Sequence, residues 1–284
     1  MNMFNIFCYN CGSDKHLPYA SENGFCLVKC SGCGLLYVTP RPSPAESDRA
    51  AISGVHQGEA ALVVTGCFAE WKIKHYRTVL EDLYGRHWAN QGKTWLDVGC
   101  GHGEFLLALR QYSRGGIVGS GLEPNVGKQE SARARGLNVS SFELDGHAER
   151  YDVVSFLNVY SHLHDPPTFM RECRAVLKPR GELLVQTGDS ADIPSDEIFR
   201  PLSLPDHLSF ASEKIVVNLL RRSGFREVAV KKYPVYPFKA WPCIKAFVKL
   251  LFPSRRSEAR DLIRRYWLSH KYHTDMYIRA VLEE

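Results

Sequence analysis

The sequence predicts an α/β protein in which a mostly parallel, doubly wound sheet follows a small cysteine-rich ribbon. Three observations predict this class. Strand and helix patterns alternate between Trp95 and Thr187, at intervals that imply right-handed crossovers and parallel strands. A glycine-rich turn joins the first of these strands to its helix. Two C-x-x-C pairs precede the alternating pattern, near the start of the chain.

The glycine turn is the most informative segment. The apolar run from Trp95 to Val98 is typical of a buried parallel strand, and a helix is expected to begin after Gly103. Gly99, Gly101 and Gly103 lie between them, and the missing Cβ atoms let a bulky ligand rest against bare backbone. The G-x-G-x-G spacing differs from the G-x-G-x-x-G of dinucleotide sites, which argues against an NAD-dependent dehydrogenase.

Further strands continue the pattern. Residues Ile117 to Leu122 form a second strand that ends at Glu123, and a carboxylate there suits the two hydroxyls of a ribose. The other predicted elements are strands at Tyr151–Leu157, Glu182–Thr187, 226–232 and Thr274–Leu282, with helices at about Cys67–Arg86 and Pro167–Val176.

These segments resemble successive motifs of class I S-adenosylmethionine-dependent methyltransferases. The likeness spans about residues 67 to 232. It is carried by Trp95–Phe105, Glu123-Pro124, Tyr151–Val154, "LNVYSHLHDP" (157–166), "VLKPRGELLV" (176–185), "LPDHLSFAS" (204–212) and "LLRRSGF" (219–225). The resemblance implies a Rossmann-like seven-stranded sheet, mostly parallel with the last strand antiparallel, and S-adenosylmethionine as cofactor. Arg180 departs from the family's glycine, in a turn far from the cofactor.

The resemblance also implies where the cofactor binds. The expected cofactor-binding residues are Asp97, Gly99, Cys100, Gly101, Gly103, Glu123, Pro124 and Asn158. The acidic residue that contacts adenine is left open between Glu143 and Asp145. The helix near 67–86 is expected to cover the pocket, with Trp71 and Tyr76 either touching ligand or packing in the core.

Two histidines are candidates for catalysis. If the acceptor is a hydroxyl, a base is useful, and histidine titrates near neutral pH. His162 and His207 fall on positions that match the family's motifs, and each is either the base or a structural imidazole. His164 is the weaker candidate, because Asp165-Pro166 predicts a turn with that side chain in solvent.

Four of the nine cysteines have metal-ligand spacing. Cys8-x-x-Cys11 and Cys30-x-x-Cys33 match a structural zinc ribbon, in which four thiolates close a tetrahedron. Such a Zn²⁺ ion stabilises a fold and leaves no open position for catalysis. The other five cysteines lack partners at ligand spacing and are expected to be ordinary thiols.

The expected organisation is a zinc ribbon over 1–42, a linker over 43–66 and a methyltransferase domain over 67–284. Residues 45–66 of the linker are expected to form either a loop or a loop with a short helix. An insertion at about 233–272 is expected to shape the acceptor pocket. The hydrophobic fraction of 44% and charged fraction of 24% are ordinary for a soluble globular protein. No apolar stretch is long enough to span a bilayer, so a cytoplasmic enzyme is expected.

The functional hypothesis is methyl transfer from S-adenosylmethionine to a small-molecule or glycan-like acceptor, at oxygen. RNA is the second choice of acceptor, because the ribbon offers only Lys15, Lys29 and Arg41 as basic residues. A third hypothesis is a non-catalytic scaffold that binds partners through the ribbon. The intact glycine set and Glu123 count against that hypothesis.

Overall fold

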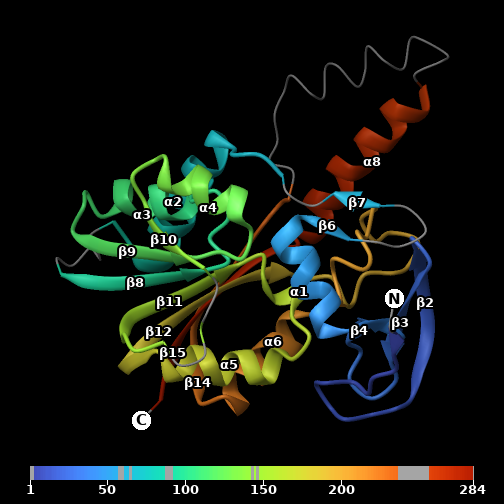
Figure 1. Cartoon of the computed structure of the whole chain (residues 1–284). Helices are drawn as coiled ribbons and strands as arrows, with labels where there is room; N and C mark the ends of the chain where they lie inside the picture. Colours follow the sequence, from blue (N-terminus) through green and yellow to red (C-terminus); the bar gives the residue numbers. More distant parts are fainter. Residues whose placement is uncertain are drawn as a thin grey trace.

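A computed structural model describes residues 3–56, 61–63, 66–86, 92–141, 144, 147–235 and 256–283. Its centre is a seven-stranded sheet with the order β10-β9-β8-β11-β12-β15-β14 (Figure 1). The strands are β8 (Lys93–Val98), β9 (Ile117–Leu122), β10 (Asn138–Ser140), β11 (Tyr151–Leu157), β12 (Leu177–Gly188), β14 (Phe225–Tyr233) and β15 (Asp275–Leu282). The first five strands in that order are parallel, and β15 runs antiparallel to both neighbours. The predicted fold class is confirmed.

Helices cover both faces of this sheet. Figure 1 shows α2 (Glu70–Tyr84), α3 (Glu104–Tyr112) and α4 (Val126–Arg133) on one face, and α5 (Pro166–Ala175) and α6 (Glu213–Arg222) on the other. Alternate residues of each strand point to opposite faces. Trp95 therefore packs with the apolar residues of α2 and α3, whereas Leu96 joins those of α5 and α6. The carboxyl ends of the parallel strands are left free to build a site.

The ribbon shares a sheet with the rest of the chain. Strands β2 (His16–Glu22), β3 (Phe25–Cys30) and β4 (Leu36–Val38) continue onto β13 (Ser209–Phe210), which lies far away in sequence. The short strands β1 (Met3–Phe4) and β5 (Arg41–Pro42) pair beside them. The hydrophobic core of the ribbon is continuous with the core under α5 and α6. The ribbon predicted over 1–42 therefore completes its sheet with a strand from the larger domain.

The segment predicted to be a linker contains regular structure. Helix α1 (Pro44–Ser53) begins at a capping box between Ser43 and Glu46, and β6 (Val55–His56) pairs with β7 (Leu62–Val63). The side-chain amide of Asn125, which caps α4, donates to the carbonyl of Ile52 at 2.8 Å. This segment thus lies against the element that follows Glu123.

Part of the predicted insertion can be compared with the structure. Helix α8 (Arg256–Tyr272) is present, whereas 236–255 lie outside the described residues, as do Glu143 and Asp145. Among the described residues, none of the helices combines the length and apolar character that crossing a membrane demands.

Candidate functional site

The glycine turn forms the floor of an open site at the end of β8. The backbone N–H groups of Gly99 and Cys100 both donate to the carbonyl of Leu122, at 2.7 and 3.0 Å, which binds the turn to the end of β9. Gly99 has φ +74°, and a Cβ there would lie 2.4 Å from Val159. At Gly101, by contrast, no heavy atom of the described residues lies within 4 Å of the point that a Cβ would occupy. The turn is therefore closely packed at Gly99 and has open space at Gly101.

Glu123 is held rigidly beside this turn. Its Oε2 accepts the N–H of Gly101 at 2.8 Å, and its Oε1 accepts the N–H of Asn125 at 3.0 Å. The side chain is buried, and each carboxylate oxygen still has a lone pair for a second hydrogen bond. Gln129 donates to the Glu123 carbonyl at 2.7 Å. A carboxylate fixed in this way is ready to accept two hydroxyl groups without reorganisation.

Asp97 is a buried carboxyl group below the turn. It accepts a hydrogen bond of 2.6 Å from Ser155 Oγ, which in turn accepts one of 2.9 Å from the Trp95 indole. Burial raises the pKa of Asp97 to about 7, although the Ser155 hydrogen bond opposes the shift. A cationic ligand group nearby would ionise this carboxyl group at neutral pH.

The remaining predicted cofactor residues lie around the same edge. Pro124 follows Glu123, and Asn158 follows β11 with φ +59°, its N–H donating to the Gln186 carbonyl at 3.2 Å. Cys100 is buried, and burial raises the pKa of its thiol, which makes it unreactive.

The start of helix α2 is bound to the residue that follows the glycine turn. The N–H of Ala69, its N-cap residue, donates to Glu104 Oε1 at 2.9 Å. Burial raises the pKa of Tyr76, whose ring packs edge-on against Phe105 of α3 with the centroids 5.5 Å apart. Trp71 is 52% exposed on the same helix. Of the two aromatic residues named from the sequence, Tyr76 therefore packs against α3, whereas Trp71 is exposed.

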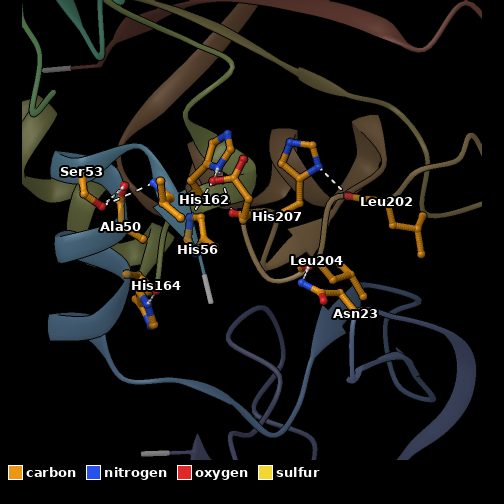
Figure 2. A network of polar contacts seen from close by, with 12 residues as sticks. Asn23, Ala50, Ser53, His56, His162, His164, Leu202, Leu204 and His207 are labelled. Atoms are coloured by element: carbon orange, nitrogen blue, oxygen red, sulfur yellow. Dashed lines mark hydrogen bonds and ion pairs between the residues drawn. The ribbon is translucent and has the colours of Figure 1, made fainter. Parts of the chain in front are cut away.

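His162 and His207 come together with two residues that sequence reasoning missed. His162 Nδ1 lies 2.8 Å from the Asp206 carbonyl and 3.2 Å from Asp206 Oδ1, and His56 Nε2 lies 2.9 Å from the same Oδ1. The rings of His162 and His207 are 4.9 Å apart (Figure 2). The adjacent "DH" in "LPDHLSFAS" is a signal for Asp206. His56, from β6, has no comparable sequence signal.

Hydrogen bonds fix the tautomer of both rings. His207 Nδ1 lies 2.9 Å from the Leu202 carbonyl, and a carbonyl can only accept. Nδ1 therefore carries the proton on each ring when it is neutral, which leaves the Nε2 lone pair of each free to take a proton.

The two imidazoles have pKa values displaced in opposite directions. Burial lowers the pKa of His162, but the hydrogen bond and charge of Asp206 outweigh burial, so the net pKa is raised. Burial and the neighbouring His162 lower the pKa of His207 to about 4. Burial opposes ionisation of Asp206, yet the hydrogen bonds from His162 and His56 hold its pKa well below the usual range. At neutral pH, His207 is neutral and Asp206 is ionised.

One sequence prediction about this edge is wrong. The side chain of His164 does not lie in solvent: it is half-buried, and its Nε2 lies 2.8 Å from Ser47 Oγ on α1. Burial, together with Arg41, lowers its pKa to about 4. The cause is α1, because a helix stands where the sequence predicts a linker and covers this turn.

A second polar cluster lies on the α2 side of the sheet. His75 Nε2 lies 3.1 Å from both Asp275 Oδ2 and Tyr277 Oη, and Gln186 Nε2 donates to Asp275 Oδ1 at 2.6 Å. Gln186 Oε1 is buried and has no hydrogen-bond partner among the described residues. These residues come from α2, β12 and β15, so no local sequence pattern could have grouped them.

The four predicted metal ligands form one cluster in the ribbon. The Sγ atoms of Cys8, Cys11, Cys30 and Cys33 all lie within 4.8 Å of one another. Cys8 and Cys33 are 3.5 Å apart at Sγ, as are Cys11 and Cys30. A tetrahedron with Zn–S bonds of about 2.3 Å needs sulfurs about 3.8 Å apart. The donor set fits a closed tetrahedral site.

The sheet order, the glycine turn and the carboxylate after β9 together define a class I S-adenosylmethionine-dependent methyltransferase. Residues 69–230 match the family described as "Methyltransferase domain", which is more than half of the chain, and the protein belongs to that family.

Individual relatives agree with this assignment. The chain is 27% identical over 158 residues to a ubiquinone biosynthesis O-methyltransferase of Vibrio campbellii, covering 49% of this chain and 66% of that protein. It is 35% identical over 109 residues to the protein of the same name from Marinobacter nauticus, covering 34% and 44%. The alignments therefore span less than two thirds of these relatives. A putative sarcosine dimethylglycine methyltransferase from Galdieria sulphuraria shares the fold, with a TM-score of 0.52, 17% identity and coverage of 84% and 97%.

Proposed function

We propose that the protein transfers a methyl group from S-adenosylmethionine to a hydroxyl of a small-molecule or glycan-like acceptor. The observation that carries the proposal is that the Glu123 carboxylate is fixed by the N–H of Gly101, beside the open space at that glycine. Glu123 would bind the ribose hydroxyls, and Gly99 to Gly103 would contact the methionine part. The O-methyltransferase names of the relatives support oxygen as the methylated atom.

The bound cofactor supplies an electrophilic methyl group on a sulfonium centre. The protein's part is alignment, exclusion of water and removal of the hydroxyl proton. His162 and His207 each offer a free Nε2, and Asp206 stabilises the positive charge that His162 acquires when it takes the proton. The acceptor hydroxyl would lose its proton to histidine as its oxygen takes the methyl group, and the cofactor would leave as neutral S-adenosylhomocysteine.

The test is a methyl-transfer assay with S-adenosylmethionine labelled in the methyl group and a panel of phenolic and sugar hydroxyl acceptors. We expect label in at least one acceptor as a methyl ether, with S-adenosylhomocysteine formed in equal amount. Binding of the cofactor without transfer to any hydroxyl of the panel would contradict the proposed acceptor class.

Cofactor affinity should depend on pH through Asp97. We expect the cation of S-adenosylmethionine to bind the ionised form of this carboxyl group, whose pKa is about 7 in the free protein. Protons must therefore leave on binding below pH 7, and affinity at pH 6 should be about tenfold weaker than at pH 8. Calorimetry in two buffers of different ionisation enthalpy measures this release. Asp97→Asn should bind with no such dependence, and equal pH dependence in both proteins would contradict the assignment.

We also propose that the cysteine cluster holds one structural Zn²⁺ ion. Metal analysis of the purified protein should give about one zinc per chain, since four thiolates complete the coordination. Cys30→Ser should lose most of this zinc and lower the melting temperature. Cys26→Ser is the matched control, because Cys26 is exposed on the same strand and lies outside the cluster. Equal zinc in all three proteins would contradict this site.

A further inference from the structure

A partly buried turn between Arg200 and His207 surrounds one carboxylate of the ribbon. Glu22 accepts the backbone N–H groups of Leu202 and Ser203, at 2.7 and 2.6 Å, and that of Leu204 at 3.3 Å. Ser203 has φ +60°, a left-handed conformation that turns successive N–H groups toward one point. Leu202 and Leu204 are buried, so these N–H groups would be costly to leave unpaired. The Glu22 carboxylate thus pairs three backbone N–H groups of this turn.

The same turn holds His207 in place. The carbonyl of Leu202 accepts from His207 Nδ1 at 2.9 Å, and the carbonyl of Ser203 accepts from the His207 N–H at 3.1 Å. The residues that Glu22 binds through their N–H groups thus bind His207 through their carbonyls. Figure 2 shows Leu202 beside His207, with Leu204 and Asn23 below. Asn23 adds a hydrogen bond of 3.3 Å to the Leu204 carbonyl.

A second contact with the ribbon lies just after His207. The N–H of Val38, in β4, donates to the Leu208 carbonyl at 2.9 Å, and β13 pairs with β4 from Ser209 onward. The ribbon therefore contacts the chain on both sides of His207 in sequence. The tip of the β2–β3 hairpin contacts residues 202–204, and β4 contacts residues 208–210. The hairpin tip is the Asn23-Gly24 pair, both with positive φ, a turn that the right-handed twist of paired strands favours.

We infer that Glu22 is a positioning residue of the active site, by which the ribbon holds the Leu202–Leu204 turn and so orients His207 toward the acceptor. This role rests on the proposed function, in which His207 contacts the reacting hydroxyl. Glu22 itself touches neither acceptor nor cofactor. The ribbon is accordingly part of the acceptor site, and its integrity should control the state of His207.

The experiment compares the wild-type protein, loaded with zinc and bound to S-adenosylhomocysteine, with Glu22→Gln and Glu22→Ala. Glu283→Gln is the control, since it removes an equal charge from an exposed pair with Arg226. Two readouts report the turn directly: hydrogen exchange of the amides of 202–204, and titration of the His207 ring by NMR. Zinc content and S-adenosylhomocysteine affinity are measured on the same samples.

We expect exchange at 202–204 to accelerate by about tenfold in Glu22→Gln and by more in Glu22→Ala, because glutamine keeps one of the two acceptor oxygens and alanine keeps neither. The pKa of His207 should rise toward its ordinary value of about 6.5 as the ring gains solvent. Zinc content and cofactor affinity should stay at wild-type values. Wild-type exchange and titration in both variants would overturn the positioning role. Failure of the wild-type protein to bind the cofactor would instead overturn the proposed function.

Discussion

Replacing Glu123 with glutamine is expected to weaken S-adenosylhomocysteine binding by about tenfold to a hundredfold. In the proposed site the carboxylate would offer two acceptor oxygens to the ribose, whereas the amide keeps one and turns the other into a donor. A hydrogen bond to a charged group contributes about 1.5–3 kcal/mol, which corresponds to this range of affinity. The glutamine side chain keeps the size of the buried residue, but its NH2 group faces the N–H of Gly101 or Asn125, so one of these two hydrogen bonds is also lost.

Titration calorimetry measures this loss. Glu130→Gln is the matched control, because Glu130 is exposed on α4, the helix that follows Glu123. Gly101→Arg should weaken binding to a similar or greater extent, since its side chain would fill the space above the turn. Wild-type affinity in both Glu123→Gln and Gly101→Arg would contradict a ribose site here.

Removal of His162 or His207, the two proposed catalytic histidines, should lower turnover without changing cofactor affinity. We expect His207→Ala and His162→Ala each to reduce kcat by about 10²–10⁴, the usual contribution of a positioned acid–base group. Both rings have a free Nε2, but of the two it is His162 that forms an ion pair with the Asp206 carboxylate, which stabilises its charged form. The variant with the larger loss of kcat identifies the ring that takes the proton.

The assay uses the hydroxyl acceptor found by the methyl-transfer panel, with S-adenosylhomocysteine affinity measured alongside. His164→Ala is the control on the same loop, since its ring binds Ser47 of α1 rather than Asp206. Normal turnover in both His162→Ala and His207→Ala would reduce them to structural residues. His75, which pairs with Asp275 at the start of β15, would then be the next histidine to test.

The pH profile of kcat should reflect the protonation of His162. His162 must be neutral to accept a proton, and Asp206 raises its pKa, so the rate should rise with pH through a value above about 6.5. The groups that face His162 are Asp206, His207 and, more distantly, Lys128. Asp206→Asn removes the charge that favours the protonated ring, and should move this rise to lower pH.

The central sheet could be predicted from the sequence because its signals are local. Trp95–Val98, the three glycines and Glu123 lie on one strand–turn–helix–strand unit, and each has a conformational reason to be where it is. The strand over Ile117–Leu122 matches β9, and the helix over Pro167–Val176 differs from α5 by one residue at each end. The ligand spacing of the four cysteines likewise grouped residues that do meet.

What the sequence could not predict depends on long-range contacts. Asp206 and His56 meet His162 from segments with no shared periodicity, and the β13 strand of two residues is too short to give a pattern. Helix α1 falls where a linker is predicted because its apolar face is weak, and its stability comes from the capping box and from packing beside α4. The link between Glu22 and the turn before His207 joins residues about 180 positions apart.

Calorimetric titration of the zinc-loaded wild-type protein with S-adenosylmethionine, and separately with NAD⁺, tests the central assignment most directly. We predict one S-adenosylmethionine bound per chain with a dissociation constant of about 1–100 μM, roughly −8 to −5 kcal/mol, and no heat from NAD⁺. A protein that is folded, carries its zinc and takes up no S-adenosylmethionine would contradict the account.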